Sequence, residues 1–215
     1  MAASNRIIDL RRLLAERFPH TLVPPGNRLR TGLPAIDAAL GGLPKNAITE
    51  LSTPNLSGGS ALLLHLLLRN AHRDGFFVAL VDGKDSFDPH TAGSVVLPNL
   101  LWTRCHHASQ AVQAADLLLR DGNFPLVILD LVLNPSEELR KIPQTHWYRL
   151  QRLVEIIPAA FLVLTRQSII SSAQLKLFLE NAWHLRDLEQ PDLDARLKIQ
   201  VARVHGGTEI MARAG

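Results

Sequence analysis

A loop with two glycines, placed between an apolar strand and an apolar helix, constrains the fold of this chain most. Residues 47–51 read Ala-Ile-Thr-Glu-Leu and are predicted to form a strand, and an apolar helix is predicted from Ser60 onward. The connection from Ser52 to Ala61 reads Ser-Thr-Pro-Asn-Leu-Ser-Gly-Gly-Ser-Ala. Strands and helices alternate along much of the remaining sequence, which is typical of an α/β fold with a mostly parallel sheet.

The loop has the position of a phosphate-binding loop but lacks its chemistry. Such a loop reads G-x-x-x-x-G-K-[ST]: its backbone N–H groups surround phosphates, its lysine contacts the β- and γ-phosphates, and its hydroxyl holds Mg²⁺. Here Gly58 matches the second glycine and Ser60 the hydroxyl residue, and Ser57 precedes them. Thr53 stands in place of the first glycine and Gly59 in place of the lysine. The sequence therefore predicts a pseudo-ATPase with a degenerate nucleotide loop, no catalytic residues and no cofactor.

Six segments on both sides of this loop resemble the core of RecA-family recombinases. In chain order they are residues 33–51, 76–89, 124–130, 161–167, 175–178 and 195–204. The resemblance covers roughly residues 30–205, nearly the whole chain. The resemblance implies a RecA-like core, with a mostly parallel central sheet flanked by helices.

Several positions match chemical residues of those recombinases. Asp82 and Asp88 fit a strand that ends in Asp-x-Glu-x-x-x-Asp-Pro, and Lys84 occupies the place of its catalytic glutamate. Asp130 ends a Walker-B-like apolar strand. Gln167 follows a strand similar to the one that ends in a nucleotide-sensing glutamine. One alternative stays open, a weak ATPase in which Lys84 supplies the missing lysine.

Two loops that contact single-stranded DNA in recombinases have weak counterparts here. The first, residues 134–141, has mixed charge, and the second, residues 168–173, is short and lacks a Gly-rich insert. Proteins that bind single strands combine a basic groove with aromatic stacking. The candidate DNA contacts are Arg140, Lys141 and Arg166, with Trp147 as the nearby aromatic residue.

The first 29 residues are predicted to form an arm that precedes the core domain of residues 30–215. Residues 5–18 have the pattern of an amphipathic helix. Pro24-Pro25-Gly26 then breaks the chain like a linker. The arm could cover its own core, or dock on another copy or on a partner, as such segments do in RecA-like proteins. Its predicted contact residues are Ile7, Leu10, Leu14 and Phe18.

Composition and charge favour one globular α/β core in a reducing cytoplasm. The 215 residues are 47% hydrophobic, and no apolar run reaches the ~20 residues needed to cross a bilayer. One cysteine, Cys105, excludes an internal disulfide. Three adjacent residues, Cys105-His106-His107, cannot all face one ion, so no metal site is expected. A net charge of +3 is compatible with nucleic acid without indicating it.

Within the RecA superfamily, the decayed loop and the compact core look like the ImuA group, also called SulA-like. The segment Leu97–Arg104 and the helix expected after it, residues 108–120, also resemble ImuA-type sequences. The resemblance implies a cytoplasmic accessory or adaptor in the SOS response and in translesion DNA synthesis. Its expected partners are a Y-family-like polymerase subunit and an error-prone polymerase complex. The alternatives are a RecA-paralogue recombination mediator that binds single-stranded DNA, and the weak ATPase.

Overall fold

The computed structural model describes residues 26–56, 58–181, 183 and 196–204, and their centre is a seven-stranded sheet. The strands are β3 (Ala47–Ser52), β4 (Val78–Asp82), β5 (Leu100–Arg104), β6 (Leu126–Asp130), β7 (Ala160–Thr165), β8 (Leu175–Leu179) and β9 (Ile199–Val204). Their order is β5-β4-β6-β7-β3-β8-β9. All neighbouring pairs are parallel except β8 and β9, which are antiparallel. The predicted α/β fold with a mostly parallel sheet is confirmed.

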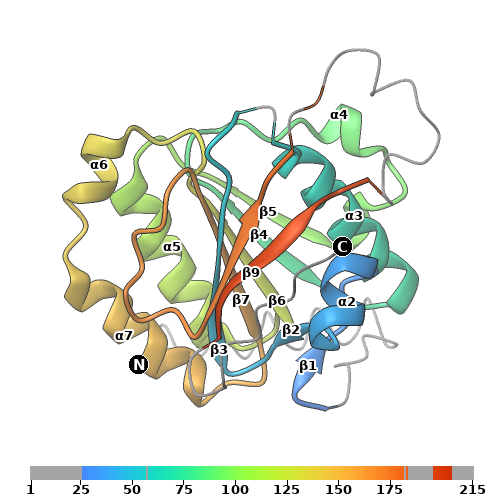
Figure 1. Cartoon of the computed structure of the whole chain (residues 1–215), viewed down its shortest axis with the longest axis horizontal. Helices are drawn as coiled ribbons and strands as arrows, with labels where there is room; N and C mark the ends of the chain where they lie inside the picture. The colour runs from blue at the N-terminus through green and yellow to red at the C-terminus, as the bar shows by residue number, and fades with distance from the viewer. Residues whose placement is uncertain (1–25, 57, 182, 184–195, 205–215) are drawn as a thin grey trace, which may run out of the picture.

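Helices cover both faces of the sheet, because side chains alternate between the faces along each strand. Val78 and Leu80 of β4 belong to one buried cluster with the apolar side chains of α2 and α3. Ala79 and Val81 belong to a second cluster with those of α5 and α7. Figure 1 shows these two helical layers on opposite sides of the strands. The helices are α2 (Pro34–Leu40), α3 (Ser60–Asp74), α5 (Ala108–Asp121) and α7 (Gln144–Glu155).

Smaller elements complete the described core. β1 (Arg28–Leu29) pairs antiparallel with β2 (Leu43–Pro44), and Leu29 is buried in the cluster under α3. Leu29 belongs to the predicted arm, and it packs with the core. The predicted boundary between arm and core at residue 30 stays a prediction. A 3₁₀ turn precedes β5. The remaining short helices are α4 (Pro89–Ala92) and α6 (Ser136–Arg140).

Two details differ from the prediction. Residues 134–141, expected as an open loop, contain helix α6, which begins after Pro135 and places two acidic residues in its first turn. Trp147 is only 1% exposed, because it lies on the apolar face of α7 that packs against the sheet. It is therefore not available to stack on a base.

Other predictions fall on residues outside the described ranges. The arm contacts Ile7, Leu10, Leu14 and Phe18 and the loop residue Ser57 are all among them. Within the described part of the chain, no helix is long and apolar enough to cross a membrane.

Candidate functional site

Several polar groups of the loop between β3 and α3 form hydrogen bonds within the loop or to the neighbouring strand β7. The N–H of Thr53 donates to the carbonyl of Thr165 at the end of β7, over 2.8 Å. The Thr53 hydroxyl and the N–H of Gly58 both donate to the carbonyl of Asn55, each over 3.0 Å. A phosphate-binding loop instead turns such N–H groups toward the ligand. The N–H groups of Thr53 and Gly58 are therefore already used within the protein.

Gly59 occupies the place of the lysine, and its surroundings are filled. Its φ of 94° lies in the left-handed region, which a side chain disfavours. A Cβ added there would meet both Nε1 of Trp183 and Cδ1 of Leu197 at 2.9 Å. Next to it, the Asn181 side-chain amide donates to the carbonyl of Gly58 over 2.9 Å. Residues following β8 thus pack over the loop at the point where a lysine side chain would begin.

A cleft of about 310 Å³ opens beside this loop at the carboxyl ends of the strands, and we call it the strand-end cleft. Ligands bind at this edge in open α/β sheets. The predicted residues Ser60 and Asp130 both line it, together with Asp88. The other lining residues are Leu56, Ala61, Leu64, His65, Ser86, Phe87, Thr91, Ala92, Val132 and Leu133.

Asp82 organises the turn after β4 and does not face the cleft as a free acid. It is 1% exposed, and its carboxylate accepts the N–H groups of Ser86 and Phe87 over 2.7 Å each. It also accepts the N–H of Lys84 over 3.2 Å and the indole N–H of Trp102 over 3.3 Å. These bonds fix the segment that leads into α4 and forms one wall of the cleft.

Asp130 lies at the end of β6, directly opposite Asp82 in the parallel register. The pKa of Asp130 is raised to about 6: burial has the largest effect, a hydrogen bond from the N–H of Val132 opposes it, and the nearby Asp82 charge adds to it. The side chain is half-buried. Carboxyl groups with a raised pKa are common at functional sites, and they also occur in buried networks that only stabilise the fold.

This pKa predicts how stability depends on pH. The folded protein binds the Asp130 proton more tightly than the unfolded chain, so the ionised carboxylate opposes folding above pH 6 and stops doing so as pH falls towards 4. Asp130→Asn should raise the free energy of unfolding at pH 8 by about 1–2 kcal/mol, a value reduced for partial solvent exposure. Urea denaturation at pH 5, 6.5 and 8 measures this, with the exposed Glu137→Gln as control. If the stabilisation by Asp130→Asn were larger at pH 5 than at pH 8, the raised pKa of Asp130 would be contradicted.

Lys84 does not reach the strand-end cleft. Its ammonium donates to the carbonyl of His106 over 3.3 Å and lies 3.8 Å from a carboxylate oxygen of Glu138. The same carboxylate accepts the N–H of Ala108 at the start of α5 over 3.0 Å. That hydrogen bond, more than the nearby cations, holds the pKa of Glu138 below its usual range. Lys84 is thus directed toward α5 and α6.

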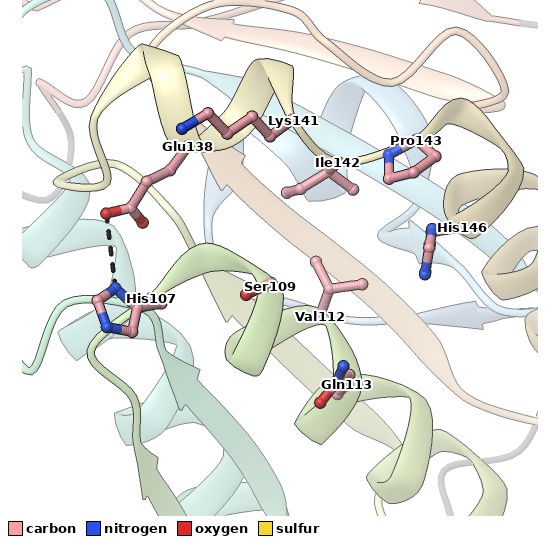
Figure 2. Close-up of a pocket in the computed structure, with 9 residues that line it drawn as sticks. All are labelled: His107, Ser109, Val112, Gln113, Glu138, Lys141, Ile142, Pro143 and His146. Atoms are coloured by element: carbon pink, nitrogen blue, oxygen red, sulfur yellow. Dashed lines mark ion pairs between the residues drawn. The ribbon is translucent and has the colours of Figure 1, made fainter.

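The candidate DNA contacts lie near α5 and α6, away from the strand-end cleft. Figure 2 shows Lys141 beside a cavity of about 220 Å³ between α5 and the α6–α7 segment, where His107 and Glu138 form an ion pair at 3.7 Å. Arg140, Lys141 and Arg166 are exposed. Gln167 donates from its amide to the hydroxyl of Ser136 over 3.3 Å, which joins the end of β7 to α6. Gln167 therefore lies with these basic residues rather than in the strand-end cleft.

Glu50 is a residue that the sequence interpretation missed. It is 0% exposed in the middle of the sheet, on β3. One carboxylate oxygen accepts the N–H groups of Ile169 and Ile170 over 2.6 and 3.0 Å. The other accepts the hydroxyl of Ser168 over 2.8 Å and lies 3.2 Å from the ammonium of Lys176. Glu50 thus fixes the start of the segment that was expected to be the second DNA loop.

The sheet order, the loop between β3 and α3, and the acids that end β4 and β6 together define a RecA-like α/β protein. The model of the RecA N-terminal domain matches residues 25–154, more than half of the chain. The chain belongs to this family.

Individual relatives agree with this assignment. Protein RecA of Frankia alni is 36% identical over 122 residues, which are 54% of this chain and 35% of that protein. Protein RecA of Clavibacter michiganensis is 37% identical over 130 residues, 58% of this chain and 34% of that protein. The match thus spans about a third of the length of these curated relatives.

Proposed function

We propose that this protein is a non-hydrolysing, RecA-like accessory or adaptor protein of the DNA damage response that acts through contacts with other proteins. The observation that carries the proposal is the packing of Trp183 and Leu197 against Gly59. A side chain at the position where a nucleotide-hydrolysing loop has its lysine would have to displace these two side chains. A fold without its motor chemistry can still present surfaces, which is what an adaptor needs.

The charge of the strand-end cleft supports the same conclusion. Asp88 and Asp130 line it, and among its described lining residues only His65 can carry a positive charge. A triphosphate carries several negative charges, so this cleft repels it where a working site attracts it. The weak-ATPase alternative needs a cation from elsewhere, and Lys84 is held by His106 and Glu138 instead.

The finer assignment is an ImuA-like role in translesion synthesis, with a Y-family-like polymerase subunit and an error-prone polymerase complex as partners. It rests on the sequence resemblance together with membership of the RecA N-terminal domain family. We expect the full chain to co-purify in a fixed ratio with the Y-family-like protein of its native host. The complex should form equally with and without ATP. Separate elution of the two proteins at micromolar concentration would reject this partner.

Single-stranded DNA binding is a second candidate function, favoured by the proximity of Arg166 to α6 through the Gln167–Ser136 hydrogen bond. Binding should be insensitive to base sequence and should fall steeply with salt, since phosphate contacts dominate it. Replacing Arg140, Lys141 and Arg166 with alanine should reduce the slope of log K against log salt by about 2. Fluorescence anisotropy with a labelled oligonucleotide measures this slope. An unchanged slope would place any DNA contact elsewhere.

A further inference from the structure

The strand-end cleft has the chemistry of a docking site for apolar and basic side chains. Leu56 and Leu133 are 60% and 47% exposed, and both line the cleft. Leu64, Phe87 and Val132 continue its apolar wall. Large exposed apolar side chains beside a cavity are typical of binding surfaces.

Two acids complete this surface. Asp88 and Asp130 line the same cleft, so a segment that brings basic groups next to apolar ones would fit both parts. The volume of about 310 Å³ is at the lower end for ligand sites, which suits a few inserted side chains better than a large cofactor.

We propose that the strand-end cleft binds residues 5–18 of this chain. That segment has the complementary chemistry, with an apolar stripe of Ile7, Leu10, Leu14 and Phe18. It also carries four arginines, at positions 6, 11, 12 and 17, against only Asp9 and Glu16. The arginines pair with Asp88 and Asp130, and the apolar stripe covers Leu56 and Leu133.

The length of the chain allows this contact. Described residues begin at Gly26, just before β1, which pairs with β2 near the start of β3. The cleft lies at the other end of β3, a strand of six residues that spans about 20 Å. Residues 19–25 can extend over about 25 Å, and a helix over residues 5–18 adds about 21 Å. The arm can therefore extend from Gly26 to the cleft.

A labelled synthetic peptide of residues 4–20 tests the proposal by fluorescence anisotropy. The receptor is the full chain with Leu10→Ser and Leu14→Ser, which release its own arm from the cleft. We expect this receptor to bind the peptide more tightly than the unchanged chain does, because the native arm competes. Adding Leu56→Lys and Leu133→Lys to the receptor should weaken binding by at least about tenfold.

Matched controls use apolar residues elsewhere that are at least as exposed. Leu117 and Ile156 are 68% and 79% exposed and do not line the cleft, so Leu117→Lys and Ile156→Lys should leave binding unchanged. Thermal unfolding verifies that each variant is folded. If Leu56→Lys and Leu133→Lys together unfold the receptor, the single substitution Leu133→Lys replaces them in the binding assay. The proposal is wrong if the Leu10→Ser, Leu14→Ser receptor does not bind the peptide. It is also wrong if the cleft and control substitutions have equal effects.

Discussion

Replacing Glu50 with alanine is expected to lower the free energy of unfolding by about 3–5 kcal/mol. The carboxylate is 0% exposed and accepts three hydrogen bonds, from Ser168, Ile169 and Ile170. Its removal leaves two buried N–H groups without an acceptor and separates Lys176 from its counter-charge, 3.2 Å away. Equilibrium denaturation in urea, followed by circular dichroism, measures the change.

Two further variants separate the parts of this effect. Glu50→Gln keeps an oxygen for the N–H groups of Ile169 and Ile170, so its cost should be about 1–2 kcal/mol. Glu180→Ala removes an exposed carboxylate that accepts a hydrogen bond from the amide of Gln200, over 2.8 Å, and should cost less than about 0.5 kcal/mol. Equal losses for Glu50→Ala and Glu180→Ala would show that the buried network does not stabilise the sheet.

Restoring a lysine at Gly59 is expected to destabilise the protein by about 2–4 kcal/mol and to restore no ATP hydrolysis. The left-handed φ of 94° strains any side chain, and the new Cβ meets Trp183 and Leu197. Turnover should stay at background with or without single-stranded DNA. The resemblance to recombinases aligns Lys84 with their catalytic glutamate, and each positioned group typically contributes ~10²–10⁴-fold.

Gly41→Ala is the matched control for backbone strain. Gly41 is also left-handed, with φ 68° and ψ 13°, but a Cβ there meets only Cδ of Arg28, at an ordinary 3.6 Å. Its substitution should cost about 1 kcal/mol, and Gly59→Ala should cost more because of the two close contacts. A phosphate-release assay on the unchanged chain and on Gly59→Lys completes the test. Steady turnover that disappears with Asp130→Ala would overturn the pseudo-ATPase assignment.

Local patterns in the sequence were sufficient to predict most of the fold. The strands that end at Asp82 and Asp130 are short apolar runs that end in an acid, and the structure places these two ends next to each other at one edge of the sheet. The missing lysine was also visible, because a motif compares residues at fixed spacing. These features depend only on neighbours in the chain.

The features that were missed depend on distant partners. Glu50 accepts hydrogen bonds from residues 118 to 120 positions away, so nothing next to it indicates a buried network. Trp183 and Leu197 lie far from Gly59 in the sequence, and only the folded structure brings them to the loop. Helix α6 was predicted as a loop because family comparison, rather than its own acidic first turn, guided the prediction.

The position of β3 in the sheet also affects how the chain folds during synthesis. β3 pairs with β7, and paired residues Ser52 and Thr165 are 113 positions apart. At 5–20 residues per second, the ribosome needs roughly 6–23 s to make the intervening chain. During that time the apolar side chains of α3 have no completed sheet to cover. We therefore expect nascent chains that stop before residue 160 to bind chaperones, and longer chains to release them once β7 has emerged.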